Sequence, residues 1–426
     1  MKHPNNSVLI VGAGMAGLAC ALKLHEAGRP VQLFEGGDKV GGRVRTDRVD
    51  GFLLDRGFQV YLDTYPETGK LLDVEALDLR PFAPGALVYR DGRLHRLMDV
   101  FRRPASLWPS LIAPVGSFAD KLRVGRLRAK ILGSSSQRIA ERPDRSTETY
   151  LRESGFSEPM IDDFFRAFYG GIFLERDLQT SSRMFEFTFK LFGRGSATVP
   201  ARGMGEIPAQ LASRLPQESI HLNCPVRKID RGQSSLTLAD GRSIKGSAIV
   251  IATDGSTAHR LLADRGPAPN APKWRSVTNL YFSAEQSPVR EAIICLNGSG
   301  QGRVNNVCVM SDAAPAYAPV RQSLISVSVL GLHDDTALSQ EVLDELADWF
   351  GPVTKRWKHL RTDRIEQGLP EQLAGRDTTG LAEYDGVWVC GDHLSSASIE
   401  GAVVSGQKAA EAVCASLGAA RKSGWA

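Results

Sequence analysis

The chain has 426 residues, 42% of them hydrophobic and 23% charged, which is enough for two or three domains with substantial cores. A net charge of +4 is too small at this length to indicate nucleic-acid binding, and no apolar run is long enough to cross a bilayer. The six cysteines show no zinc-like spacing, so we expect reduced thiols in a cytoplasmic protein and no metal site.

The chain opens with a strand–turn–helix pattern that is typical of a nucleotide site. A buried strand is predicted over residues 7–11 and a helix over residues 16–27. Between them, Gly12 permits a tight turn, Gly14 lets the backbone approach a pyrophosphate, and Gly17 lets the helix pack closely on the sheet. The N-terminus of this helix would then face the phosphates.

A second buried strand, over residues 31–35, ends in an acidic residue. Glu35 lies about 20 residues beyond Gly14, where a carboxylate can accept hydrogen bonds from ribose hydroxyls. The apolar stretch after Lys2 has some features of a secretion signal, but cleavage there would destroy the nucleotide motif. Because strand, helix and acid agree, we favour a dinucleotide site over a glycine-rich turn in an ordinary strand–helix–strand unit.

Further along the chain, nucleotide-domain patterns recur after long interruptions. Residues 51–61 combine strand formers with glycines, residues 87–95 predict a hairpin with an Asp-Gly turn, and residues 99–215 are mainly helical. The later predicted elements are strands over residues 220–229, 235–238, 248–252, 278–283, 324–330 and 386–390, and helices over residues 340–349 and 401–417. This order favours two interleaved domains over a linear series.

At Gly41-Gly42-Arg43 and again at Gly391-Asp392, the chain resembles the flavin superfamily of amine oxidases, protoporphyrinogen oxidases and carotenoid desaturases. The resemblance implies that the first two glycines approach the pyrophosphate and that Arg43 donates hydrogen bonds to it. It also implies that Asp392 binds the ribityl chain or the pyrophosphate. A nicotinamide enzyme has no use for the C-terminal motif, so the two motifs together imply FAD, bound non-covalently.

The same resemblance assigns further residues to the cofactor. The backbone of Val226 would meet the adenine ring, and the last helix would direct its N-terminal dipole at the flavin, where negative charge develops on reduction. The complete predicted cofactor site is Gly12, Gly14, Met15, Ala16, Gly17, Glu35, Gly41, Gly42, Arg43, Gly57, Phe58, Gln59, Val226, Gly391, Asp392, Ser398, Ile399 and Ala402.

The implied fold class is α/β with α+β: a discontinuous Rossmann-like FAD-binding domain of the glutathione-reductase type, interleaved with a substrate domain of mixed β-sheet and helices. We expect the FAD-binding domain to comprise residues 1–80, 216–265 and 381–426. The substrate domain would comprise a hairpin over residues 81–98, a mainly helical insert over residues 99–215 and a sheet over residues 266–380.

Catalytic side chains are not evident, because a flavin accepts a hydride at N5 without help from a protein nucleophile. Gly57, Phe58 and Gln59 are expected to line the active face of the flavin. His393 could act as a base, but a shielding role beside the ribityl chain is favoured. Lys273 could correspond to the lysine that amine oxidases hold near N5, although an exposed loop lysine is the favoured alternative.

Two segments of the helical insert each allow two interpretations. Residues 164–173 and 184–192 are unusually aromatic and form either the core of the insert or the wall of an apolar substrate tunnel. Residues 102–130 combine seven positive charges with apolar residues at roughly helical spacing, as in a helix lying in a membrane interface. Pro109 and Pro114 should break such a helix, and a solvated basic face explains the charges equally.

The sequence therefore predicts an FAD-dependent oxidoreductase of desaturase or oxidase type, nearest the carotenoid-desaturase branch. It would dehydrogenate or isomerise an apolar polyene- or porphyrin-like substrate. A flavin amine oxidase releasing peroxide is the first alternative, but those enzymes usually place an aromatic residue where Ser398 stands. A non-catalytic flavin-binding partner protein is the second alternative. The electron acceptor, the oligomeric state and peripheral membrane contact through residues 102–130 stay open.

Overall fold

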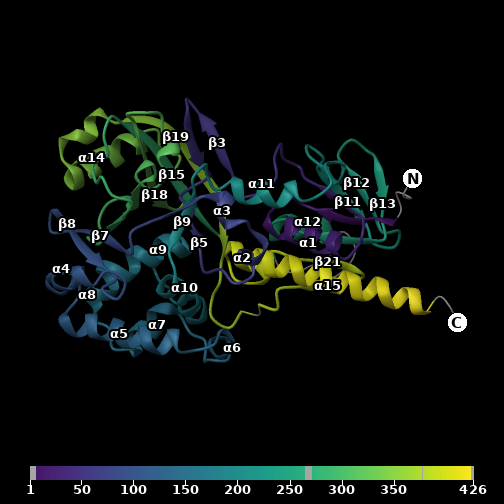
Figure 1. Cartoon of the computed structure of the whole chain (residues 1–426), viewed down its shortest axis with the longest axis horizontal. Coiled ribbons are helices and arrows are strands. Elements are labelled where there is room, and N and C mark those ends of the chain that lie inside the picture. Colours follow the sequence, from purple (N-terminus) through teal and green to yellow (C-terminus); the bar gives the residue numbers. More distant parts are fainter. Residues whose placement is uncertain (1–5, 264–270, 377, 424–426) are drawn as a thin grey trace.

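The computed structural model describes residues 6–263, 271–376 and 378–423. Figure 1 shows two halves. One contains a mostly parallel sheet with α1 (Met15–Glu26), α12 (Gly255–Leu262) and α15 (Ile399–Ser423), and the other contains a larger mixed sheet with most of the helices. The chain passes between the halves several times, so each half contains segments that are distant in sequence.

The first half is built on a six-stranded sheet from three distant parts of the chain. Its strands, in spatial order, are β10 (Ile220–His221), β2 (Val31–Phe34), β1 (Val8–Val11), β14 (Ala248–Ile251), β21 (Val387–Val389) and β20 (Ala382–Tyr384). Only the edge pair β20–β21 is antiparallel; the other pairs are parallel. Every residue of β1 and β14 is buried, as expected of parallel strands covered on both faces.

Two helices pack against each other beside this sheet with almost no space between their backbones. α1 (Met15–Glu26) follows β1, and α15 (Ile399–Ser423) ends the described chain (Figure 1). A Cβ on Gly406 of α15 would lie 2.1 Å from the carbonyl oxygen of Ala16, and one on Gly17 would lie 2.0 Å from that of Gly12. Glycine at these two positions therefore lets α1 approach both the strand end and α15.

Smaller elements complete this half. A separate antiparallel sheet lies beside it, and the remaining short strands connect the two halves. These elements are β11 (Val226–Asp230), β12 (Ser235–Leu238), β13 (Ser243–Lys245), β3 (Thr46–Val49), β4 (Phe52–Asp55), β5 (Tyr61–Leu62), β6 (Leu79–Pro81), β9 (Ala197–Pro200), α2 (Thr68–Leu71), α3 (Val74–Leu77), α11 (Glu206–Ser213) and α12 (Gly255–Leu262).

The second half is built on a seven-stranded mixed sheet. Its order is β19 (Lys358–Pro370), β15 (Trp274–Ala284), β18 (Ser323–Leu330), β17 (Val304–Val309), β16 (Ile294–Asn297), β7 (Gly85–Arg90) and β8 (Arg93–Met98). One face packs on α14 (Leu338–Phe350) through apolar residues such as Phe282, Val327 and Trp349. The short helix α13 (Met310–Ala313) follows β17.

The helical insert has an aromatic core around Phe165, Tyr169 and Phe185. One stretch of it, Ile161–Arg166, is a π-helix, a form that frequently marks functional sites. The other helices of the insert are α4 (Leu107–Ile112), α5 (Phe118–Leu132), α6 (Ser136–Ala140), α7 (Thr147–Glu153), α8 (Glu158–Met160), α9 (Ala167–Phe173) and α10 (Ser182–Arg194).

The two halves are joined at a buried carboxylate, Asp55, at the end of β4. It accepts hydrogen bonds from the Tyr317 hydroxyl at 2.7 Å, from Met204 N at 3.0 Å and from the Thr46 hydroxyl. The Tyr281 hydroxyl donates to the Asp55 carbonyl oxygen at 2.7 Å. Burial raises the pKa of Asp55 to about 6, although the hydrogen bonds oppose that shift. These contacts fix the start of the segment that continues to Gln59.

Most predicted strands and helices are confirmed to within a few residues, including the Asp-Gly turn between β7 and β8. The single strand predicted over residues 220–229 is wrong, because this stretch forms two strands, β10 in the six-stranded sheet and β11 in the separate antiparallel sheet. The C-terminal helix is longer than predicted, because it begins at Ile399. The expectation that prolines break the helix over residues 102–130 is confirmed at Pro114, which lies between α4 and α5, but not at Pro109, which α4 contains. Pro109 lies in the first turn of α4, where a backbone N–H has no helical partner, so proline is tolerated there. The domain boundaries stay a prediction.

The contact between α1 and α15 leads to a test with two identical substitutions in one helix. Gly406→Ala places a methyl group against the Ala16 carbonyl and should destabilise the protein by at least about 2 kcal/mol. Gly418→Ala, where no atom lies within 4 Å of the added methyl, should stabilise α15 by about 0.5–1 kcal/mol. Chemical denaturation of both variants measures the difference. Equal stabilities would contradict the proposed role of Gly406.

Candidate functional site

A cavity of about 1530 Å³ runs from the ends of the parallel strands to the helical insert. The residues lining it include Gly12 after β1, Glu35 after β2 and Gly391 after β21 at one end, and Phe168 and Phe192 at the other. A pocket for one drug-sized ligand measures roughly 300–1,000 Å³. The cavity therefore has room for a dinucleotide and a second molecule.

The nucleotide end of the cavity is lined by backbone without side chains at Gly12, Gly14 and Gly41, which we call the glycine cradle. Gly12 has φ +100° and its Cβ would lie 2.8 Å from the Ala252 carbonyl oxygen, so only glycine fits there. Gly41, with φ +112°, donates through its N–H to Ala13 O at 2.8 Å and pairs with Gly14. Gly14 precedes the first residue of α1 and has no side chain to cap the helix. The free N–H groups and the helix dipole suit an anionic phosphate.

Glu35 is held by two backbone N–H groups from either side of the cradle. Its Oε2 accepts from Ala13 N and its Oε1 from Gly37 N, both at 2.8 Å. Each carboxylate oxygen can accept a further hydrogen bond, so Glu35 is both fixed and able to bind ribose hydroxyls. Val226, at the start of β11, lines the cavity nearby, because Cys224 N donates to Glu35 O at 2.8 Å.

Arg43 and Asp392 form an ion pair that the sequence did not reveal. Arg43 Nη2 lies 2.5 Å from Asp392 Oδ1, Nη1 donates to Gly368 O at 2.9 Å, and the guanidinium lies over the Trp274 ring. Asp392 is buried, whereas the Arg43 side chain is 35% exposed. The two residues come from opposite ends of the chain and line one wall of the cavity.

The segment from Gly57 to Gln59 also lines the cavity. Gln59 Nε2 donates to Arg43 O at 2.8 Å and to Arg56 O at 3.1 Å, which fixes the orientation of its amide. Its Oε1 is buried and has no hydrogen-bond partner among the described residues. A buried acceptor without a donor is costly unless a ligand supplies one, and the ring N–H of a flavin is such a donor.

The first turn of α15 forms the opposite wall through Ser398, Ile399 and Ala402. Ser398 Oγ accepts from Gly401 N at 3.0 Å and so caps the helix. Glu400 is buried and accepts at 2.9 Å from the backbone N–H groups of Glu67 and Thr68. This turn is therefore anchored, with its N-terminal dipole toward the cavity.

All the predicted cofactor residues except Gly17 line this one cavity, and Gly17 instead packs α1 onto the strand end. The two lesser catalytic candidates do not line it. His393 is buried behind Gly391, and burial lowers its pKa. Lys273 is exposed.

Cys390 is buried, and desolvation raises its pKa to about 12, which disfavours the thiolate needed for a covalent flavin bond. The residues present fit non-covalently bound FAD.

The aromatic residues of the insert serve as core and as cavity wall at once. Phe165 and Tyr169 are almost fully buried, yet they line the cavity together with Phe164, Phe168, Phe189 and Phe192. The interpretation as core of the insert is therefore confirmed, and the same residues line the cavity; that a substrate occupies it stays a prediction. Sequence reasoning missed Asn306 and Ser328, which line the cavity from β17 and β18. The alternating serines in the run Ser323–Leu330 were the available signal.

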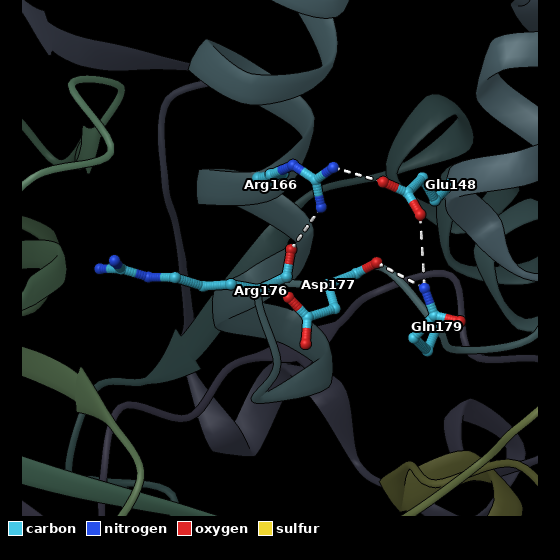
Figure 2. A pocket seen from close by; sticks show the side chains of 5 residues that line it. All are labelled: Glu148, Arg166, Arg176, Asp177 and Gln179. Atoms are coloured by element: carbon cyan, nitrogen blue, oxygen red, sulfur yellow. Dashed lines mark hydrogen bonds and ion pairs between the residues drawn. The ribbon is translucent and has the colours of Figure 1, made fainter.

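An ion-pair cluster holds the aromatic wall in place from outside (Figure 2). Arg166, at the end of the π-helix, pairs with Glu148 of α7 and donates through Nη1 to Arg176 O at 3.0 Å, beyond the end of α9. Gln179 Nε2 donates to Asp177 O at 3.0 Å and lies 3.4 Å from Glu148. These groups line a second pocket of about 420 Å³, but they bind one another and clamp both ends of α9.

The cavity extends to exposed residues near α4 and α5. Phe101 and Leu122 line it and are 60% and 52% exposed, and Trp108, Ile112 and Phe118 on these two helices are also exposed. We call these five residues the apolar rim. Over the described ranges, no helix is long and apolar enough to cross a membrane, and no cluster of potential metal ligands occurs.

Comparison with known proteins places this geometry in a family. Residues 15–414 match the family described as flavin containing amine oxidoreductase. Coproporphyrinogen III oxidase of Propionibacterium freudenreichii subsp. freudenreichii is 25% identical over 61% of this chain and 59% of its own length. Carotenoid phi-ring synthase of Streptomyces griseus is 25% identical over 98% of this chain and 90% of its own.

Solved structures agree on the fold. A candidate protoporphyrinogen oxidase from Exiguobacterium sp. 255-15 superposes with a TM-score of 0.73 at 21% identity, covering 96% of this chain and 98% of that one. The sequence match spans most of the chain, and the residues that line the cavity fit FAD. The chain therefore belongs to the flavin-containing amine oxidoreductases, a family of FAD-dependent oxidoreductases.

Proposed function

We propose that this protein dehydrogenates or isomerises an elongated apolar substrate, such as a polyene or a porphyrin-like ring, by hydride transfer to FAD. The observation that carries the proposal is the continuity of one cavity from the Gln59 segment, through the aromatic wall, to the apolar rim. Bound FAD supplies the hydride acceptor, N5 of its ring system. The relatives that are named for porphyrinogen and carotenoid chemistry support a substrate of this size and polarity.

In this proposal the protein binds, orients and excludes water. The glycine cradle and the α1 N-terminus hold the pyrophosphate, Glu35 the adenosine ribose and Val226 the adenine. The Arg43–Asp392 pair carries no net charge, so it can orient the ribityl–pyrophosphate region without adding an unpaired buried charge. The α15 dipole favours the negative charge that the ring gains on reduction.

A flavin amine oxidase stays the first alternative. Flavin amine oxidases usually enclose the amine between aromatic rings, one of them at the position of Ser398. In this chain the Ser398 hydroxyl instead caps α15. The aromatic residues of the insert surround a space suited to a long apolar molecule, and positively charged amines would have to cross that apolar wall. We therefore favour the apolar substrate.

Anaerobic titration of the purified flavoprotein tests the function. We expect the oxidised flavin absorbance at about 450 nm to bleach with a polyene such as phytoene or with a porphyrinogen, and not with primary amines. Bleaching with amines alone would favour the amine oxidase. Failure to bleach with any substrate, with FAD still bound and every substrate recovered unchanged, would favour a flavin-binding partner protein without turnover.

Glu35 offers a test of the cofactor site itself. Glu35→Ala removes the acceptor for Ala13 N and Gly37 N together with the ribose ligand, so the Kd for FAD should rise about 10- to 100-fold. Asp38→Ala is the matched control, because Asp38 is exposed and, among the residues that the structure describes, pairs with Arg45 alone. Fluorescence titration of the apoprotein with FAD measures both constants. An unchanged Kd in the Glu35 variant would remove Glu35 from the cofactor site.

We further propose that the apolar rim contacts a membrane surface with anionic headgroups. Two rim residues, Phe101 and Leu122, line the cavity, so an apolar substrate could pass from lipid to cavity without crossing water. Basic residues accompany them: Lys121 lines the cavity with Arg102 and Arg128, and Arg123 and Lys130 follow on α5. Several of these basic groups also bind the protein, as Arg128 does with Asp99 at 2.9 Å.

Vesicle co-sedimentation tests membrane contact. The double variant Trp108→Ser/Ile112→Ser removes two rim side chains that are 74% and 75% exposed and should lose binding to anionic vesicles at least about tenfold. Val320→Ser is the control, since Val320 is 91% exposed outside the rim. Equal loss in the control, or binding that survives in the rim variant, would contradict the proposed surface.

A further inference from the structure

A row of buried polar side chains crosses the cavity-facing side of the seven-stranded sheet. Asn279 of β15, Ser328 of β18 and Asn306 of β17 are direct partners in the strand registers. Their exposed fractions are 0%, 5% and 2%. The other face of the same strands packs on α14 through apolar residues such as Leu280, Val307 and Val327. Polar groups at such positions are unfavourable unless they are hydrogen-bonded, so their presence calls for a reason.

The row forms a connected set of hydrogen bonds. Asn306 Nδ2 donates to Ser328 Oγ at 3.3 Å, and Ser328 Oγ donates to Asn279 Oδ1 at 3.1 Å. Asn279 also exchanges hydrogen bonds with Ser326. At the other end, Asn305 Nδ2 donates to Asn306 Oδ1 at 3.0 Å. The row is therefore oriented by its own bonds before any ligand arrives.

One donor in this row is left over. The Asn306 amide has two N–H groups, and only one has a partner among the described residues, Ser328 Oγ. Asn306 Oδ1 and Ser328 Oγ each keep room for one more hydrogen bond. Both residues line the cavity, between apolar neighbours such as Phe168 and Ile294. A ligand placed there meets one N–H donor and two oxygen acceptors on an apolar surface.

The backbone of the insert is shaped to admit these amides. Asn305 lies at a register irregularity in β17, where the pairing with β18 skips one residue. A Cβ on Gly171 of α9 would lie 3.0 Å from both Asn305 Nδ2 and Asn306 Oδ1. Glycine at this position therefore leaves space for two adjoining amides instead of a packed methyl group.

We propose that Asn306 and Ser328 bind a neutral oxygen group, a hydroxyl or a carbonyl, carried by an otherwise apolar substrate. This inference rests on the proposed function and narrows its substrate. A pure hydrocarbon would leave the second N–H of Asn306 buried without a partner. A carboxylate would face two acceptor oxygens, and the row contains no cation to pair with it. A hydroxyl or carbonyl accepts from the N–H, and a hydroxyl can also donate back.

Binding of four polyenes with one carbon skeleton tests the proposal without turnover. The probes are axerophtene, retinol, retinal and retinoate, which end in a hydrocarbon, an alcohol, an aldehyde and a carboxylate. Perturbation of the oxidised flavin spectrum of the holoenzyme measures their Kd values. We expect retinol and retinal to bind at least about tenfold more tightly than the other two. Equal affinities, tightest binding of retinoate or axerophtene, or no binding at all would overturn the proposal.

Two variants test whether Asn306 and Ser328 cause the preference for alcohol and aldehyde. Asn306→Leu should remove the preference for alcohol and aldehyde while axerophtene binding stays or improves. If the leucine variant does not fold, Ser328→Ala serves as the test instead. It is a smaller change that keeps Asn306, and it should reduce the preference for alcohol and aldehyde several-fold. Ser323→Ala is the control: it is buried on the same strand but does not line the cavity, and it should leave the preference unchanged. A preference that survives in both cavity variants would overturn the assignment.

The two proposals fail in different ways. A flavin that no polyene or porphyrinogen can reduce, in a protein that still prefers retinol over axerophtene, would contradict the proposed reaction and support the oxygen site. Reduction by a hydrocarbon polyene, with no preference among the four probes, would support the reaction and contradict the site.

Discussion

The close contact between α1 and α15 is the constraint on which the rest of the structure depends. Both helices begin at the cavity, α1 at the glycine cradle and α15 at Ser398, so their mutual distance sets two helix N-termini around one ligand. That distance exists because Gly406 presents no side chain to the Ala16 carbonyl. The Arg43–Asp392 pair and the hydrogen bonds of Glu400 then tie the same two ends of the chain together near the site.

The cavity has one polar end, which must replace water around a nucleotide, and one apolar end, which must exclude water. The nucleotide end must replace water around phosphates and hydroxyls, and it does so with backbone N–H groups, Glu35 and a neutral ion pair. The other end must stay dry, and aromatic rings from the π-helix and α9 enclose it. Asp55 lies where the two halves of the fold meet, and its burial there raises its pKa to about 6.

Much of the nucleotide half could be predicted from sequence, because its motifs are local: a glycine turn, an acid at fixed spacing and a helix after the last strand. The Arg43–Asp392 pair joins residues far apart in sequence, so no local pattern could show it. The substrate end depends on strand register, which decides that Asn306 faces Ser328 and the cavity. The low helix propensity of proline also gave the wrong prediction for Pro109, because proline is tolerated in the first turn of a helix, where Pro109 lies.

The strand order of the parallel sheet has a consequence for how the protein is made. β1 lies between β2 and β14, and β14 pairs with β21, which is synthesised after every strand of the seven-stranded sheet. A nascent chain therefore carries the glycine cradle for most of its synthesis without the wall that closes it. The complete flavin site therefore forms only after β21 and the first turn of α15 have been synthesised. Because FAD would bind only the folded state, bound flavin would then stabilise that state over partly folded chains with exposed aromatic residues.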